Sequence, residues 1–231
     1  MNLAILQARM SSTRLPGKVM APVLGAPMIG RQVERLRYAT CIDKLVVATS
    51  SDPSDDPLAA YCASQGIAVF RGSLNDVLGR FAGAMAQHSD AEVVIRLTAD
   101  CPLTDGSVVD AVVERHLSSG ADYTSNTASR TFPHGLDVEV ARASALLDAW
   151  QEAQDAYDRE HVTPFIYRRP ERFHLEGVKR APSLAHLRWT VDVHEDLEFV
   201  RDVYARLYPS DPGFGTEAIA GLAWNSSRAI P

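Results

Sequence analysis

Short apolar runs alternate with segments of helical spacing through the first half of the chain. The runs predicted to be strands are Leu3–Leu6, Lys44–Thr49, Ile67–Phe70 and Glu92–Leu97. Three helices are predicted between and after these strands. The first ends near Gly66, the second carries apolar residues from Val77 to Met85, and the third carries them from Val108 to Leu117. This alternation predicts an α/β fold with a mostly parallel sheet, right-handed crossovers and a ligand site beyond the carboxyl ends of the strands.

The pattern changes near Tyr123. Extended segments are predicted at Tyr123–Asn126 and His134–Val140, and together they are interpreted as an arm inserted at about residues 123–140. Helical spacing returns at Ala141–Trp150, around Glu160–Tyr167 and at Leu197–Leu207, with a strand-like run at Phe173–Val178. Because no repeat or low-complexity linker interrupts the chain, one domain over residues 1–231 is expected.

Composition excludes several classes of protein. Hydrophobic residues make up 46% and charged residues 23%, and no apolar run approaches the roughly 20 residues that span a bilayer. The N-terminus lacks the charged leader and long apolar segment of a secretory signal, so a cytoplasmic location is expected. Three cysteines without metal-ligand spacing argue against a disulfide framework and a zinc site.

Charge is distributed unevenly. The chain has a net charge of −6, yet its first acidic residue is Glu34, so four cations give the first 33 residues +4 and leave −10 for the rest. This asymmetry favours a small anionic ligand near the N-terminus rather than nucleic acid, which spreads basic charge over a face. Arg9, Arg14 and Lys18 lie beside small hydroxyl residues, and this loop is predicted to bind phosphate, the alternative being a solvated basic loop.

Two aspartates are candidates for the opposite side of such a site. Asp100 follows the run Glu92–Leu97, and a parallel sheet brings this strand end to the edge where the basic loop lies. A carboxylate beside phosphates needs a cation between them, and Mg²⁺ is commonly held by one or two carboxylates plus phosphate oxygens. Asp192 is the second candidate, although with Glu195 it also resembles a capping box.

The other sequence motifs are less informative about function. Neither a GxGxxG nor a GxxxxGK[ST] pattern is present, which disfavours dinucleotide and Walker-type sites. The histidines form no Ser-His-Asp or Cys-His pattern, and Arg159–His161 is interpreted as a solvated helix start.

The segment Gln7–Lys18 resembles the signature loop of cytidylyltransferases that activate sialic-acid-like and Kdo-like sugars, and it is most similar to the SpsF-like branch of spore coat polysaccharide biosynthesis. Further segments that resemble this branch are Arg71–Gly72 with Asp76–Leu78, Arg96–Leu103, Gly135–Glu139, Arg159–Thr163, Trp189–Asp192 and Glu195–Glu198. The resemblance covers nearly the whole chain.

The resemblance implies a nucleotide-diphospho-sugar transferase (GT-A-like) fold with a mixed, mainly parallel sheet. It also implies that Arg9, Arg14 and Lys18 bind the triphosphate of CTP and that Asp100 and Asp192 bind Mg²⁺. The residues expected to contact the rest of the nucleotide are Ser11, Ser12, Thr13, Arg71, Asn75, Asp76 and Thr98. Those expected near an acidic acceptor are Asn126, Arg130, His134, Asp137 and Glu139, with Arg130 as a carboxylate partner.

The expected reaction is attack of an acceptor oxygen on the α-phosphorus of CTP, with release of pyrophosphate. A 2-keto sugar acid is the expected acceptor. The alternatives are a phosphonate acceptor, a glycosyltransferase on the same fold, which would normally carry Asp-x-Asp where this chain has Asp100-Cys101-Pro102, and a non-catalytic nucleotide-binding module. No nucleic-acid or membrane partner is expected. A homodimer that pairs through the arm is expected.

Overall fold

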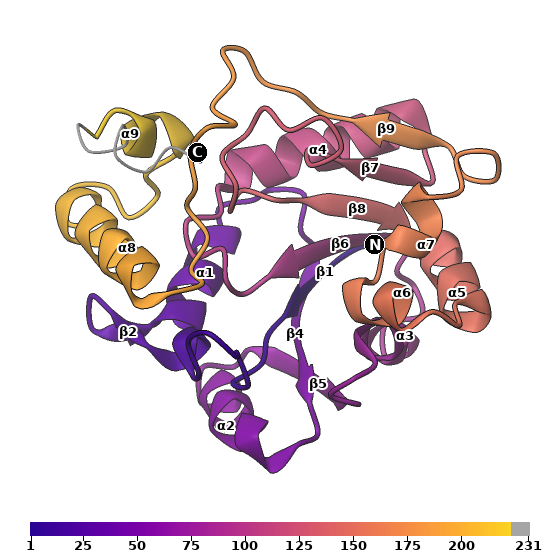
Figure 1. Ribbon diagram of the computed structural model, residues 1–231, viewed down its shortest axis with the longest axis horizontal. Coiled ribbons are helices and arrows are strands. Elements are labelled where there is room, and N and C mark those ends of the chain that lie inside the picture. Colours follow the sequence, from indigo (N-terminus) through magenta and orange to yellow (C-terminus); the bar gives the residue numbers. More distant parts are fainter. Residues whose placement is uncertain (223–231) are drawn as a thin grey trace.

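The computed structural model describes residues 1–222, and a seven-stranded sheet runs through its centre (Figure 1). In sheet order its strands are β5 (Ala68–Gly72), β4 (Lys44–Ser50), β1 (Asn2–Gln7), β6 (Val93–Thr98), β8 (Glu139–Arg142), β7 (Tyr123–Ser125) and β9 (Leu175–Gly177). Strand β8 pairs antiparallel with β6 and β7, whereas the other described pairings of this sheet are parallel. The predicted mixed, mainly parallel sheet is therefore confirmed.

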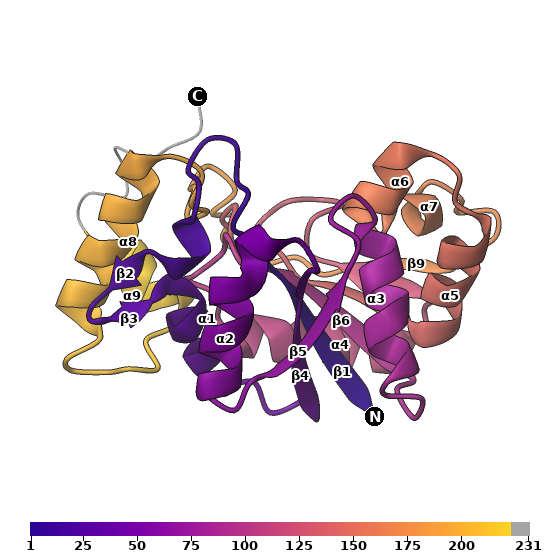
Figure 2. The same ribbon diagram turned by 90° about the horizontal axis from the view of Figure 1, so that it is seen from below.

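Helices cover both faces of the sheet (Figure 2). One apolar cluster packs α1 (Met28–Leu36), α2 (Asp56–Ser64), α4 (Gly106–Ser119) and α8 (His194–Leu207) on one face. A second cluster packs α3 (Val77–Ala86), α5 (Ala143–Glu152) and α7 (Pro164–Tyr167) on the other. The remaining elements are α6 (Ala156–His161), α9 (Thr216–Ala220), the 3-10 turns Lys18–Met20 and Pro53–Asp55, and the hairpin β2 (Pro22–Val23) with β3 (Ala26–Pro27). No helix within residues 1–222 is long and apolar enough to cross a membrane.

Strand β1 shows why the sheet needs both layers. Its side chains alternate, so that Leu3 and Ile5 enter one cluster while Ala4 and Leu6 enter the other. A strand that is apolar on both faces is stable only when both faces are covered, as in parallel α/β sheets. The N-terminal apolar run thus fixes the sheet's central strand, and the loop after it begins at the carboxyl edge.

Three details differ from the sequence-based predictions. The helix expected around Glu160–Tyr167 is two short helices, because Val162 leaves the helical region of backbone space. The inserted arm expected at about residues 123–140 begins and ends within the central sheet, because Tyr123–Ser125 forms β7 and β8 starts at Glu139. The capping carboxylate of α8 belongs to Asp196, which accepts from the backbone N–H groups of Asp192 and Val193, so the capping box predicted with Glu195 was wrong.

Burial of His116 couples folding to pH. This side chain on α4 is 3% exposed, and its Nδ1 lies 3.0 Å from Thr124 Oγ1 of β7. Burial, together with the nearby Arg142 cation, lowers the pKa of His116 to about 4. In the unfolded chain a histidine titrates near 6.5, so between these values the unfolded state binds a proton that the native state does not.

We therefore expect native stability to fall as the pH drops from about 6.5 towards about 4, by up to about 1.4 kcal/mol per pH unit from this group. The His116→Gln variant lacks this contribution, so its stability should depend less on pH. Urea unfolding at several pH values measures the difference, with His194→Gln as the control because that ring is 68% exposed. Equal pH dependence of His116→Gln and the wild type would contradict the assignment.

Candidate active site

A cavity of about 380 Å³ opens at the carboxyl ends of β1 and β6. The loop after β1 borders it on one side and the end of α6 on the other (Figure 2). The predicted residues that line it are Arg9, Ser12, Thr13, Arg14, Lys18, Thr98, Asp100 and Asp192. The structure thus brings the basic loop and both aspartates to one site.

Backbone hydrogen bonds fix the basic loop at its two ends. The Met10 N–H donates to Asp55 Oδ1 at 2.6 Å, and the Gly17 N–H donates to the Met10 carbonyl at 2.8 Å. Gly17 has a φ of +74°, which glycine adopts without the steric cost that a side chain brings. The loop therefore folds back on itself, and the Lys18 side chain points into the protein rather than into solvent.

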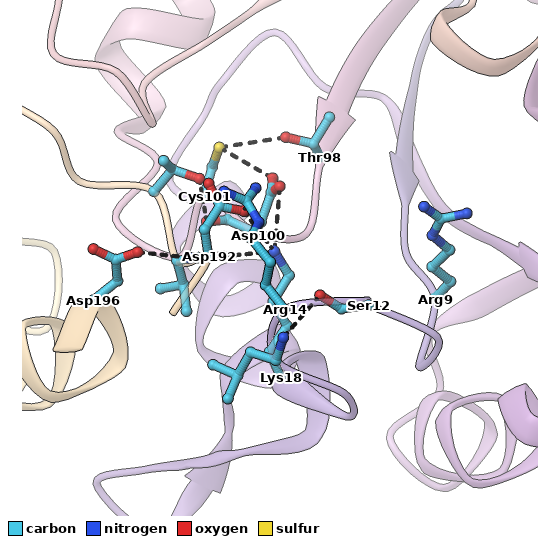
Figure 3. A network of polar contacts seen from close by, with 12 residues as sticks. Arg9, Ser12, Arg14, Lys18, Thr98, Asp100, Cys101, Asp192 and Asp196 are labelled. Carbon is cyan, nitrogen blue, oxygen red and sulfur yellow. Dashed lines mark hydrogen bonds and ion pairs between the residues drawn. The ribbon is translucent and has the colours of Figure 1, made fainter. Parts of the chain in front are cut away.

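The ammonium group of Lys18 joins three parts of the chain. It donates to the Val191 carbonyl at 2.6 Å and lies 3.3 Å from Asp192 Oδ1 and 3.5 Å from Asp100 Oδ2. Lys18 is only 8% exposed, so these contacts replace most of its hydration. The two carboxylates therefore converge on one point at the cavity wall (Figure 3).

Asp192 contacts further cations. Its Oδ1 lies 2.8 Å from Arg14, whose side chain is 63% exposed, and its Oδ2 accepts from Arg188 at 2.6 Å. Arg188 also contacts Asp196 at 2.8 Å, which links the site to the first turn of α8. This carboxylate is thus held in place from both sides.

Backbone pairing positions the segment that carries Asp192. The Val191 N–H donates to the Asp100 carbonyl at 2.8 Å, and the Trp189 N–H donates to the His134 carbonyl at 2.6 Å. The Trp189 ring is fully buried. The two aspartates are therefore set at a fixed spacing by main-chain contacts, independently of their side chains.

Opposing effects act on the Asp100 carboxyl. Burial raises its pKa, but the Lys18 cation and hydrogen bonds from Thr98 and Cys101 outweigh burial, so the pKa lies below its usual value. Asp100 is consequently ionised at neutral pH. An ionised carboxylate at this point can bind a cation.

Arg9 lies apart from the other loop cations (Figure 3). Arg14 and Lys18 gather at the aspartates, whereas Arg9 lies 4.0 Å from Glu160 of α6. The cavity therefore has two ends, an aspartate end and an Arg9 end.

Several residues expected at the nucleotide are engaged elsewhere. Arg71 donates to the Ser50 and Asp52 carbonyls and pairs with Asp56 at 2.7 Å. Asp76 caps α3 and accepts two hydrogen bonds from Arg159, at 3.0 and 2.6 Å. The predicted residues outside the cavity lining, as far as the described residues define it, are Ser11, Arg71, Asn75 and Asp76.

The residues expected near the acceptor lie outside the cavity lining of the described chain and make separate sets of polar contacts. The Asn126 amide bridges the arm, donating to the Leu136 carbonyl at 2.7 Å and accepting from the Val138 N–H at 2.9 Å. Arg130 binds both oxygens of Asp137, at 2.5 and 3.0 Å, and His134 lies 3.9 Å from the same carboxylate.

Glu139, the last of the expected acceptor residues, is buried in a polar network. It pairs with Arg96 and accepts hydrogen bonds from the Tyr123 hydroxyl at 2.5 Å and the Thr163 hydroxyl at 2.6 Å. Arg96 in turn reaches the cavity and donates to Gln7.

Residues not anticipated from the sequence also line the cavity, namely Gln7, Arg80, Arg96, Glu160 and His161. Two of these residues could have been recognised from the sequence. Arg96 is a charge inside an otherwise apolar strand, and Arg80 lies three residues after Val77 and four before Ala84, on the buried stripe of its helix. A cation at a position predicted to be apolar marks a buried polar function.

Glu160 and His161 directly precede a strained turn. Val162 is fully buried with φ +73° and ψ −56°, and the Thr163 N–H donates to the His161 carbonyl at 2.9 Å, which is the geometry of a rare classic γ-turn. A β-branched residue in this region is an outlier that surrounding contacts must enforce. Glu160 and His161 end α6 at the cavity, so the solvated helix start expected at Arg159–His161 was wrong.

Comparison with known proteins agrees with this geometry. A family model described as cytidylyltransferase matches residues 3–211 of the chain. The chain belongs to the cytidylyltransferase family. The spore coat polysaccharide biosynthesis protein SpsF of Bacillus subtilis is 37% identical, over 98% of this chain and 96% of its own length. The SpsF-like resemblance is thereby confirmed.

Two further cytidylyltransferases are similar. The 3-deoxy-manno-octulosonate cytidylyltransferase of Geobacter sulfurreducens is 33% identical, over 80% of this chain and 82% of its own. The solved structure of a cytidylyltransferase from Leptospira borgpetersenii is 30% identical and superposes with a TM-score of 0.91, covering 98% of this chain and 95% of its own. The fold predicted from the resemblance is confirmed.

In this cytidylyltransferase, Gly135 is expected to control the position of Asp192. Its φ is +112°, and an added Cβ would lie 2.6 Å from the Thr190 nitrogen and 2.7 Å from the Trp189 carbonyl carbon. We expect Gly135→Ala to cost more than about 2 kcal/mol in unfolding free energy, because strain and overpacking add. Gly66→Ala is the control, since its φ is +65° but no atom lies within 4 Å. Urea unfolding compares the two; equal losses would refute the close-contact explanation.

Proposed function

We propose that the protein transfers CMP from CTP to an acidic acceptor, a 2-keto sugar acid of the sialic-acid or Kdo type, and releases pyrophosphate. The observation that carries the proposal is the convergence of Asp100 and Asp192 on Lys18 Nζ beside Arg14, at the edge of the cavity. Paired carboxylates next to loop cations are what a metal–triphosphate complex requires.

The aspartate end fits a hard divalent cation such as Mg²⁺. Two carboxylate oxygens, from Asp100 and Asp192, lie within 3.5 Å of the same ammonium group, so both carboxylates would face a cation that took the place of this group. Among the described residues no group of three or more His, Cys, Asp or Glu side chains could hold a metal. Phosphate oxygens and water would therefore complete the coordination, as is usual for Mg²⁺.

In the proposed reaction the loop cations change partners. Arg14 and Lys18, which pair with carboxylates in this structure, bind the β- and γ-phosphates and stabilise the charge that develops on the departing pyrophosphate. Asp100 and Asp192 would hold the metal, which would supply neutralisation of phosphate charge and polarisation of the α-phosphorus. Alignment and charge stabilisation account for most of the rate, because the protein forms no covalent bond.

The acceptor is placed beside Asp100, on the side of the arm. The His134 carbonyl accepts from the Trp189 N–H, and Val191 of the same segment donates to the Asp100 carbonyl, so this part of the arm lies near the aspartate end. Arg130, freed from Asp137, would bind the acceptor carboxylate, with Asn126, His134 and Glu139 holding this region in shape. Relatives named for spore coat polysaccharide biosynthesis and for 3-deoxy-manno-octulosonate support a sugar-acid acceptor. A homodimer paired through the arm is part of the proposal.

Pyrophosphate release with each of the four NTPs, Mg²⁺ and a panel of 2-keto sugar acids tests the proposal. We expect release with CTP, and a loss of roughly 100- to 1,000-fold in kcat/KM for Lys18→Met, because one preorganised cation at the leaving group is removed. Asp100→Asn should abolish metal-dependent turnover and keep the fold. Arg172→Gln is the matched control, since that cation pairs with exposed Asp148 and Glu152 away from the cavity.

Full activity of Asp100→Asn would remove the metal assignment. Absence of CTP-dependent release with every acceptor, together with CTP binding that Lys18→Met does not weaken, would refute the proposed function.

A further inference from the structure

Gln32 of α1 is a fully buried amide that contacts both ends of the turn containing Asp100. Its Nε2 donates to the Thr98 carbonyl at 2.9 Å and to the Thr104 hydroxyl at 3.2 Å. Only an N–H group can donate to a carbonyl, so the first contact fixes which way the amide points. Thr98 ends β6 and Thr104 lies just before α4, so one side chain bridges the whole turn between these two elements.

Other buried side chains hold the same turn. Three residues further along α1, Arg35 is 3% exposed, and its Nε donates to the Thr104 carbonyl at 2.7 Å. The Tyr204 hydroxyl of α8 donates to the Pro102 carbonyl at 2.9 Å. The backbone of the turn is thus anchored to two helices, while Asp100 itself lines the cavity.

Stability of the core does not account for the Gln32 amide. Its Oε1 is buried and has no donor in the part of the chain that the structure describes. The other residues on this stripe of α1 include the buried Met28, Ile29 and Leu36. A buried polar atom without a partner costs free energy, so an apolar side chain of similar length would suit the fold at least as well.

Both groups that the amide contacts also have a second partner. The Thr98 carbonyl accepts from the Cys101 N–H at 3.2 Å, and the Thr104 hydroxyl donates to the Cys101 carbonyl at 2.6 Å. Loss of the amide would therefore leave both groups hydrogen-bonded, with little effect on folding. What Gln32 adds to the structure is the bridge from one end of the turn to the other.

We propose that Gln32 is a positioning residue, which sets the Asp100 carboxylate in place beside Asp192 for a metal–triphosphate complex. The inference rests on the proposed function, because it takes Asp100 as a metal ligand. Residues that orient the ligands of a metal change its affinity or the turnover by roughly 10- to 100-fold, although they do not touch it. Gln32 acts through the backbone, since it holds the two ends of the Asp100 turn at a fixed separation.

The experiment compares the wild type with Gln32→Met, which removes the amide and keeps the length of the side chain. Hydrogen exchange of the free protein should be faster in the peptide over residues 98–104, because one restraint on this turn is lost. The Mg²⁺ concentration for half-maximal pyrophosphate release with CTP should rise roughly 10- to 100-fold. Mn²⁺ binding in the presence of CTP, followed by paramagnetic resonance, should weaken likewise. The midpoint of urea unfolding should not fall.

Thr49→Val is the matched control. Thr49 is also fully buried, and its hydroxyl also lacks a partner in the described chain, but it lies on β4 outside the lining of the cavity as the described residues define it. This variant should leave both the exchange of residues 98–104 and the Mg²⁺ requirement unchanged.

A second pair of variants tests the other end of the bridge and decides the question if Gln32→Met does not fold. Thr104→Val removes the hydroxyl that accepts from Gln32, whereas Thr104→Ser keeps it. We expect a raised Mg²⁺ requirement in Thr104→Val and a value near that of the wild type in Thr104→Ser. Equal values in the two variants would contradict the inference.

Unchanged exchange of residues 98–104 in Gln32→Met, or an unchanged Mg²⁺ requirement, would overturn the inference. So would an equal effect in Thr49→Val, or a loss of turnover in Gln32→Met that only follows a loss of folded protein. If the wild type releases no pyrophosphate with any acceptor, the proposed function fails, and hydrogen exchange still shows whether Gln32 holds the turn.

Discussion

The contact of Lys18 with Asp100, Asp192 and Val191 is the interaction on which the site depends. It joins the loop after β1, the end of β6 and the segment before α8, which are far apart in sequence. A buried ion pair adds little net stability, because desolvation offsets the Coulombic gain, but breaking it is costly. The contact therefore specifies where these three segments meet more than it strengthens the fold.

The cavity wall opposite the basic loop is held by hydrogen bonds on both sides of a strained turn. Arg159 is bonded to Asp76 on one side of the Glu160–His161 pair, and Thr163 is bonded to Glu139 on the other. Between them the buried Val162 is held in a conformation that a valine avoids. Strain of this kind persists only when surrounding contacts over-determine it, and it is concentrated at functional sites. The turn directs α6's last two side chains at the cavity instead of continuing the helix.

The parts of the site that could be predicted are those that follow from strand ends and a local motif. Asp100 and the loop after β1 had to share an edge once the sheet was parallel, and Lys18 lies within that loop. Arg71 shows what a motif alone cannot predict. The motif that contains this residue is recognisable in the sequence, but its guanidinium contacts backbone carbonyls and Asp56 beside its strand. His161 could not be found by spacing, since its position depends on a turn that breaks helical periodicity. Helix α1 was not predicted either, because Gln32 and Arg35 are buried within its otherwise apolar stripe.

The ion pairs of this structure bear on how the proposed substrate would bind. Lys18 and Arg14 neutralise Asp100 and Asp192, so these cations can turn to a triphosphate only if another cation replaces them at the carboxylates. Nucleotide without metal would leave Asp100 without the Lys18 cation and Asp192 with Arg188 alone. A metal ion without nucleotide would lie against the Lys18 ammonium group. Each case carries a Coulombic penalty in a partly dehydrated site. In the proposed reaction the two are therefore bound together. The internal salt bridges would then disfavour either ligand alone and keep both aspartates aligned until nucleotide and metal bind together.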